Sequence, residues 1–207
     1  MKYHNGDVYE GALHEEMKHG EGVLRFENGD VYTGEFKEEK FHGQGEHTAK
    51  EQPIEIVNDY DYSEKNYRPN FIEGTYKGKF VEGIRHGKGE FRSTETYTDY
   101  KEIVQEEYKF IGEYKEGKEH GEYCERYWRF EERRHMTESF SYKGGMKEAL
   151  FHGHGKYEPG SLLNGKARYE GEYKDGKKHG QGKETSLYWM YEGGYENDDK
   201  GGTGRRE

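Results

Sequence analysis

Residues 169–182 decide the fold, and they read Tyr-Glu-Gly-Glu-Tyr-Lys-Asp-Gly-Lys-Lys-His-Gly-Gln-Gly. Tyr169, Gly171 and Tyr173 alternate with charged residues, which is the pattern of a strand with one apolar face and one solvated face. The polar Asp-Gly stretch that follows can reverse the chain, and a second strand can return from His179. This segment therefore predicts a single β-hairpin.

The same unit recurs along the chain. Seven copies start near residues 9, 32, 76, 110, 142, 169 and 191, and in six of them a histidine follows the opening aromatic residue by ten positions. An isolated hairpin is marginal in water, so the copies must stack side by side and share one apolar stripe. We therefore predict an all-β fold: an elongated, single-layer, twisted antiparallel sheet of stacked hairpins, connected as a meander in a solenoid-like array that covers residues 1–207.

Three insertions interrupt the repeats, at residues 49–70, 93–109 and 124–139. Insertions are where a repeat protein often forms its own binding surface. We expect the first, with Pro53 and Pro69, to be an extended arm with one short strand. The second has a partly helical spacing of apolar residues and predicts a short helix. The third predicts lengthened strands around a charged tip.

Composition limits the possible functions. Only 29% of residues are hydrophobic and 37% are charged, but aromatic residues make up 15% and can supply a core. The formal net charge of −10 argues against nucleic acid and anionic membranes as ligands. The single cysteine, Cys124, excludes an intramolecular disulfide. Because no apolar run approaches a membrane span and the first residues do not resemble a signal peptide, we expect an intracellular, cytoplasmic protein.

The repeated unit resembles the MORN repeat (membrane occupation and recognition nexus), which looks like Tyr-Glu-Gly-Glu-Phe, a short polar turn and His-Gly-x-Gly. Residues 169–182 match it almost throughout, whereas Tyr123 replaces the last glycine of the fourth copy and Gly201 replaces the last histidine. The resemblance implies a scaffold in large assemblies such as ciliary radial spokes, cytoskeletal division structures and membrane junctions. It also implies two alternatives, a lipid-binding module and a regulatory array attached to an enzyme.

We find no catalytic, cofactor or metal site in the sequence. Equivalent histidines of successive hairpins should lie roughly 9 to 10 Å apart, too far to share a metal. His152 and His154 would face one side of a strand, but no third ligand is evident. Residues 160–166 have the glycine and lysine spacing of a phosphate loop, yet Ala167 stands at the magnesium-binding position and no helix pattern follows. We therefore predict that the protein is not an enzyme.

Proteins are the expected partners. The repeated rings either serve packing alone or also form an aromatic floor on which a peptide or helix lies. Arginines of the third insertion form either a solvated hairpin tip or a patch for an acidic partner. The partner-binding candidates are Tyr9, Tyr32, Phe36, Tyr76, Phe80, Tyr114, Tyr142, Tyr169, Tyr173, Tyr191, Trp128, Arg126, Arg129, Arg133 and Arg134. Residues Met1–Tyr9 align with the end of one copy and predict an exposed sheet edge that pairs with another chain.

The sequence thus predicts a non-catalytic scaffold or adaptor that binds other proteins as a subunit of a larger complex, without a cofactor. The resemblance adds the cytoskeleton or cilium as its setting. The alternative is a membrane-recruitment module that binds anionic phospholipid through the arginines of the third insertion. A regulatory part of an enzyme is a third class, although no stretch of the chain is left to form a catalytic domain.

Overall fold

The computed structural model describes residues 1–50, 74–99, 102–132, 136–162, 165–201 and 205–206. Its strands are β1 (Val8–His14), β2 (Met17–Arg25), β3 (Val31–Lys37), β4 (Lys40–Ala49), β5 (Gly74–Val81), β6 (Ile84–Asp99), β7 (Glu102–Lys115), β8 (Lys118–Glu132), β9 (Met136–Lys147), β10 (Leu150–Pro159), β11 (Arg168–Lys174), β12 (Lys177–Thr185), β13 (Met190–Glu196), β14 (Asp199–Lys200) and β15 (Arg205–Arg206).

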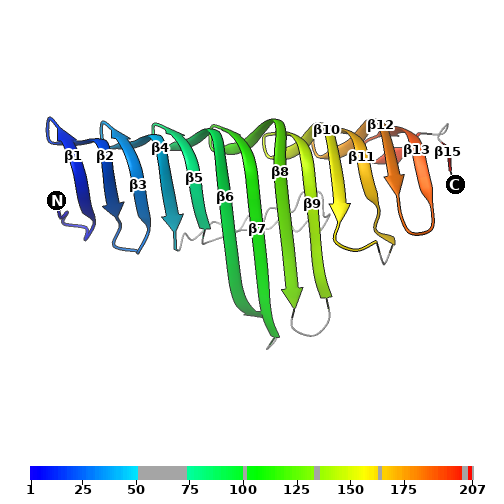
Figure 1. Ribbon diagram of the computed structural model, residues 1–207, viewed down its shortest axis with the longest axis horizontal. Helices are drawn as coiled ribbons and strands as arrows, with labels where there is room; N and C mark the ends of the chain where they lie inside the picture. Colours follow the sequence, from blue (N-terminus) through cyan, green and yellow to red (C-terminus); the bar gives the residue numbers. More distant parts are fainter. Residues whose placement is uncertain (51–73, 100–101, 133–135, 163–164, 202–204, 207) are drawn as a thin grey trace.

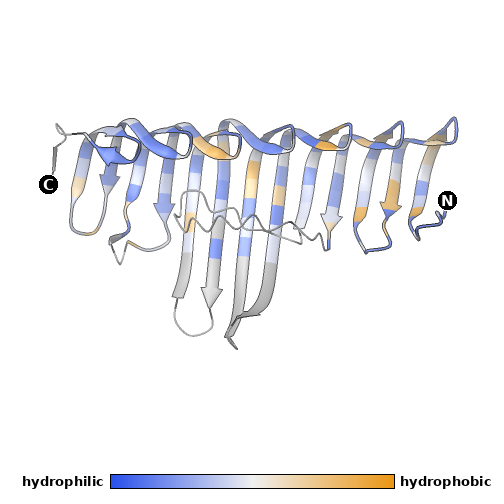
Figure 2. Ribbon diagram, turned by 180° about the vertical axis from the view of Figure 1, so that it is seen from behind, coloured by the Kyte–Doolittle hydropathy of each residue, from blue (hydrophilic) through white to orange (hydrophobic). Residues whose placement is uncertain are grey.

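All strands belong to one open antiparallel sheet in which β1 to β14 follow each other in sequence order, and β15 also pairs with β13. The sheet extends along one axis, with the N-terminus at one end and the C-terminus at the other (Figure 1). The predicted all-β meander of hairpins is therefore confirmed. Hydrophobic and hydrophilic positions alternate along the strands (Figure 2), as a sheet with an apolar inner face requires. None of the described residues forms a helix long and apolar enough to cross a membrane.

Each hairpin is closed by a two-residue turn in which the backbone φ of both central residues is positive. These turns are Glu15-Glu16, Glu38-Glu39, Glu82-Gly83, Glu116-Gly117, Glu148-Ala149, Asp175-Gly176 and Asn197-Asp198. Positive φ at both positions is the requirement of a type I′ turn, whose twist matches that of paired strands. The predicted reversal at Asp175-Gly176 therefore lies where the sequence placed it.

A pair of facing glycines sets where the hairpin bends in five of the repeats. Gly171 pairs with Gly182 across β11 and β12, and the register shifts directly after this pair. The ring of Tyr169 covers both glycines, so that a Cβ atom at Gly182 would lie 2.6 Å from Cε2 of Tyr169. A side chain there would clash with the ring. This explains why an aromatic residue and two glycines recur together, and the irregularity bends the strand over the ring.

The core is a zigzag of aromatic rings that runs along the whole array. Within one repeat, Tyr169 and Tyr173 meet edge to face with ring centroids 5.0 Å apart. Between repeats, Tyr169 also meets Tyr195 of the next hairpin at 5.2 Å. The same two contacts recur at Tyr32, which meets Phe36 of its own repeat at 5.0 Å and Phe80 of the next at 5.3 Å. Edge-to-face pairs are favourable beyond the area they bury, so each repeat is held by its neighbour.

Of the predictions for the three insertions, one is wrong, one is confirmed in its strands, and one falls almost wholly outside the described residues. The helix expected within residues 93–109 is wrong, because this segment forms the outer halves of β6 and β7, paired from Ser93–Tyr108 to Asp99–Glu102. The alternating threonines at 94, 96 and 98 favour a strand, and the neighbouring hairpins supply its ladder. The lengthened strands expected for residues 124–139 are present as β8 and β9, although the tip at 133–135 lies outside the described residues. Residues 51–70 of the expected arm lie outside them too.

Candidate interaction surfaces

The repeated rings are core residues. The ten predicted ring candidates, Tyr9, Tyr32, Phe36, Tyr76, Phe80, Tyr114, Tyr142, Tyr169, Tyr173 and Tyr191, are all between 0% and 4% exposed. Of the two alternatives, packing alone therefore describes these rings, because the aromatic floor is closed in this structure. Two features close it: the bend after each glycine pair, and a residue on the returning strand that lies over the first ring of each repeat.

We call the residue nine positions after the opening aromatic residue the lid, because in most repeats it covers the opening ring. Phe41 stacks on Tyr32 with centroids 3.7 Å apart, and Phe151 stacks on Tyr142 at the same distance. In other repeats the lid is a cation: Arg85 lies 4.8 Å from the centroid of the Tyr76 ring. Lys18, Lys178 and Lys200 also lie over the opening rings of their repeats, and Glu119 stands at the equivalent position of the fourth repeat. The lid position was missed in the sequence because its residue type changes from repeat to repeat.

Burial raises the pKa of the tyrosine hydroxyls in the core. Desolvation raises the pKa of Tyr76 to about 12, although the positive charge of Arg85 opposes that shift. Burial likewise raises the pKa of Tyr32 and of Tyr169 above the ordinary value. Each first-ring hydroxyl of these residues donates a hydrogen bond to a backbone carbonyl three residues ahead, as Tyr169 does to Glu172 at 2.9 Å. The rings are thus fixed structural groups.

Four long strands form a protrusion from the middle of the array (Figure 1). We define the protrusion as the parts of β6 to β9 that extend beyond their shorter neighbours, β5 and β10. The described ladder between β5 and β6 ends at Thr75–Arg92, and that between β9 and β10 ends at Phe140–Pro159. Among the described residues, Thr94–Asp99 of β6 have strand partners on β7 alone. Over those six residues β6 is therefore a sheet edge with no described strand beside it.

The geometry of the repeat agrees with one protein family. The family model of the MORN repeat matches residues 9–31, 32–49, 76–95, 110–122, 142–158 and 169–186, which together cover more than half of the chain. The chain is a MORN-repeat protein. The match confirms the resemblance drawn from the sequence. No curated protein matches the chain. MORN repeats form a non-catalytic family whose members bind proteins or lipids.

In this MORN array the fourth repeat departs most from the pattern, and the departure places Arg126 in the core. Arg126 is 2% exposed, bonds to Glu119, and donates a hydrogen bond of 3.3 Å to the carbonyl of Ala149. Burial alone would lower the pKa of Arg126, but Tyr108 and Glu119 raise it, so the guanidinium stays charged. Arg126 is thus a buried partner of the lid Glu119, and its expected place in an exposed basic cluster is corrected.

The other candidates of the third insertion are placed differently. Arg129 is half-buried on β8, opposite Ser139 of β9. Arg133 and Arg134 lie outside the described residues, as does the side chain of Trp128. The neighbouring Cys124 is fully buried, and desolvation raises its pKa to about 12, so the thiol is neutral. The structure therefore does not bring these residues together into one described patch.

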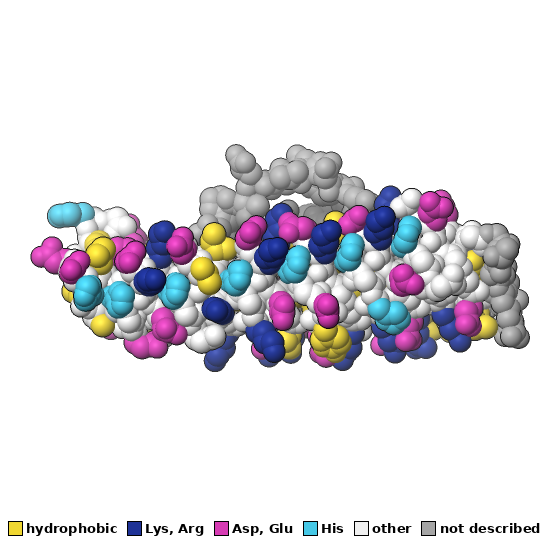
Figure 3. Space-filling model, turned by 90° about the horizontal axis from the view of Figure 1, so that it is seen from above, with side chains coloured by type: hydrophobic (Ala, Val, Ile, Leu, Met, Phe, Trp, Pro, Cys, Tyr) yellow, Lys and Arg dark blue, Asp and Glu magenta, His cyan; other side chains and the backbone are white. Residues whose placement is uncertain are grey.

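The repeat histidines lie in a row on the face that carries the turns (Figure 3). His152 Nδ1 lies 3.5 Å from Asp175 Oδ1 of the next hairpin. Within the described ranges, no group of three or more His, Cys, Asp or Glu residues is arranged to hold a metal ion. Basic and acidic side chains flank the row, so this face carries mixed charge (Figure 3).

The outer face of the sheet carries cross-strand charge pairs. Lys77 Nζ lies 3.6 Å from Glu46 Oε2, and Lys143 Nζ lies 3.0 Å from Glu125 Oε1. These pairs are exposed and contribute little to stability, but they keep the outer face hydrophilic. Large exposed apolar side chains cluster at two places: the fourth repeat, with Ile111, Tyr123 and Tyr127, and the loop before β13, with Leu187, Tyr188 and Trp189.

Proposed function

We propose that this MORN-repeat protein is a non-catalytic scaffold that binds other proteins, and that an extended peptide of the partner adds as a strand to the open edge of β6. The observation that carries the proposal is the edge of β6 over Thr94–Asp99, beside which the described part of the chain places no strand. An exposed strand edge offers a row of backbone donors and acceptors, which a peptide strand can satisfy and a lipid headgroup cannot.

The register of β6 and β7 indicates which backbone groups are available. Asp99 and Glu102 are the pair that flanks the hairpin turn, and in a two-residue hairpin this pair is hydrogen-bonded. Because the bonding direction alternates along a strand, residues 93, 95, 97 and 99 bond to β7. The N–H and C=O groups of Thr94, Thr96 and Thr98 then point to the open side. A partner strand would bond to these three residues.

Charge supports a protein partner over a membrane. The chain carries a net charge of −10, and the burial of Arg126 removes one arginine from the basic cluster on which the lipid-binding alternative depended. Clustered positive charge is what anionic lipid surfaces require. The family resemblance is what supports a cytoskeletal or ciliary assembly as the proposed setting of the scaffold.

The test is a comparison of two substitutions at one position. Thr96→Pro removes the outward N–H and places a ring on the open side, while the ladder to β7 stays complete. Thr96→Val keeps that N–H and the strand propensity. We expect proteins that co-purify with the chain at native expression to be retained by Thr96→Val and reduced roughly tenfold by Thr96→Pro. Cross-linking mass spectrometry should place the partner next to β6.

Two outcomes contradict the proposal. Equal recovery of partners by both variants would show that the edge of β6 is not used. Salt-sensitive sedimentation with anionic liposomes, unaffected by either variant and without any protein partner, would favour the lipid-binding alternative. Circular dichroism and urea unfolding of the two variants establish that both retain the fold.

A further inference from the structure

One contact joins every repeat to the next. The second residue of each turn donates its backbone N–H to the carbonyl of the lid in the preceding repeat. The six bonds are Glu39 to Lys18 at 3.1 Å, Gly83 to Phe41 at 2.8 Å, Gly117 to Arg85 at 3.0 Å, Ala149 to Glu119 at 2.8 Å, Gly176 to Phe151 at 2.9 Å and Asp198 to Lys178 at 3.0 Å. Each turn is thereby seated on the lid behind it.

The residue types at this contact are matched. Where the lid is lysine, the seated turn residue is acidic: Lys18 faces Glu39, and Lys178 faces Asp198. Where the lid is Phe, Arg or Glu, the seated residue is glycine or alanine. In both acidic cases the carboxylate accepts the lysine's own backbone N–H, at 2.5 Å for Lys18 and 2.9 Å for Lys178. Glu39 also forms an ion pair with the side chain of Lys18.

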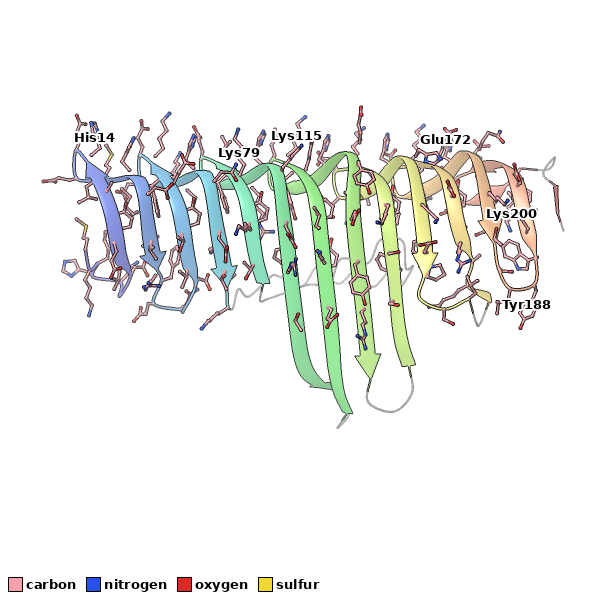
Figure 4. The ribbon with its side chains drawn as sticks, in the orientation of Figure 1. His14, Lys79, Lys115, Glu172, Tyr188 and Lys200 are labelled. Carbon is pink, nitrogen blue, oxygen red and sulfur yellow. The ribbon has the colours of Figure 1, made fainter. Side chains whose placement is uncertain are left out.

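The two ends of the array carry complementary halves of this contact. The first turn places an acid, Glu16, at the seated position, and Glu16 is exposed. The last repeat carries a lysine lid, Lys200, at the opposite end of the molecule (Figure 4). The ammonium of Lys200 pairs with Glu184, as that of Lys178 does. By the matching seen at Lys18 and Lys178, an acidic turn fits Lys200, and a lysine lid fits Glu16.

The first repeat also lacks the apolar contact that the other repeats make. Leu13 stands at the second-ring position, four residues after Tyr9, and is 47% exposed. Its equivalents Phe36, Phe80, Tyr114, Met146, Tyr173 and Tyr195 are each 4% exposed or less. On the open side of β1, Lys2 pairs with Val8, and Met1 bonds to Tyr9. The part of β1 beyond Tyr9 has no described strand on that side.

We infer that two copies of this chain associate head to tail, with the first hairpin of one copy stacked on the last hairpin of the other. In this arrangement the turn at Glu16 of one copy is hydrogen-bonded to Lys200 of the other, and Leu13 becomes buried. The contact reproduces the one that already joins the sixth and seventh repeats, at Lys178 and Asp198. Because the two surfaces differ and lie at opposite ends, association does not close and can continue into a longer array.

This contact is separate from the β6 edge of the proposed function. Sedimentation velocity of the purified chain across a range of micromolar concentrations should show a weight-average sedimentation coefficient that rises with concentration. Glu16→Lys and Lys200→Glu should each weaken this association roughly tenfold or more, because each places like charges in contact. Glu15→Lys, which makes the same charge change one residue away, should leave it intact.

Mixing the two weakened variants provides the sharpest result. The lysine introduced at position 16 of one variant then meets the glutamate introduced at position 200 of the other, and the unchanged Glu16 meets the unchanged Lys200. We therefore expect association to return on mixing. A chain that stays monomeric throughout the concentration range would overturn the inference. So would association that both single variants leave unchanged, or a mixture that stays dissociated. Thr96→Pro, which tests the β6 edge, should associate like the unmodified chain, so the two proposals can fail independently.

Discussion

Phe41 lies flat on Tyr32, with the two ring centroids 3.7 Å apart and the ring planes 4° from parallel. Phe36 and Phe80 meet the same Tyr32 ring edge to face, at 5.0 and 5.3 Å. One tyrosine is therefore enclosed by its own repeat, by its lid and by the next repeat. The lid is the part of this arrangement that varies most in chemistry, which makes it a direct test of how the core is closed.

Phe41→Ala should lower the free energy of unfolding by about 2 to 4 kcal/mol, since it removes a stacked ring and opens the cover of Tyr32. Phe41→Arg should cost less, because Arg85 performs the same role over Tyr76. Urea unfolding followed by circular dichroism measures both. If the arginine variant were as unstable as the alanine variant, the lid would not be interchangeable between ring and cation.

Gly182→Ala should destabilise the sixth hairpin by about 1 to 3 kcal/mol, because its Cβ would lie 2.6 Å from Cε2 of Tyr169 and would overpack the ring. Gly194→Ala is the matched control, since among the described residues its Cβ would meet only Nε2 of Gln181, at 3.9 Å. We expect the control to change the unfolding midpoint little. Equal effects of the two substitutions would refute the role assigned to the glycine pair.

Glu82→Asn should stabilise the protein by about 0.5 to 1 kcal/mol. Glu82 has a φ of 50° in the turn before Gly83, and Asn-Gly is the sequence that best adopts positive φ at both turn positions. Glu82→Gln removes the same charge, and with it the exposed pair with Lys40, but does not favour positive φ. Thermal unfolding should therefore show a higher midpoint for Glu82→Asn than for Glu82→Gln. The reverse order would show that the turn is not limited by backbone conformation.

Alkaline pH should unfold the protein through its buried tyrosines. Desolvation raises the folded-state pKa of Tyr76 from 10.0 to about 12 and raises that of Tyr32 and Tyr169 as well. A tyrosine with a raised folded pKa binds its proton more tightly when folded, so its contribution to stability is complete below pH 10 and is lost as the pH rises toward 12. Tyrosinate absorbance and circular dichroism should change together in this window. Full ionisation with unchanged circular dichroism would contradict the burial of these rings.

The offset between Tyr169 and His179 was enough to predict the hairpin and its stacking, because a fixed spacing over six copies reports a geometric requirement of the backbone. The lids could not be predicted, since Lys18, Phe41 and Glu119 share no chemistry and are equivalent only in position. The helix expected within residues 93–109 failed for a related reason. Residues 93–99 form backbone hydrogen bonds with the neighbouring strand β7, and the spacing of apolar residues within one segment does not report such bonds.

The sequence predicts the candidate site less well than it predicts the fold. The sequence indicates Tyr and Arg as candidates because exposed Tyr and Arg commonly anchor partners. Burial is decided by the bend after each glycine pair and by the lids, and neither could be located from residue type alone. Arg126 illustrates this point: its sequence neighbours are charged and aromatic, but its partner in the core is Glu119, the lid of the same repeat.

Amide hydrogen exchange at the edge of β6 tests the proposed protein-binding function most directly. We predict that the amides of Thr94, Thr96 and Thr98 exchange rapidly in the free chain and become protected when a co-purified protein partner is bound, while residues 93, 95 and 97 are protected in both states. Protection that appears elsewhere on binding, with the three threonine amides still exchanging rapidly, would contradict the account.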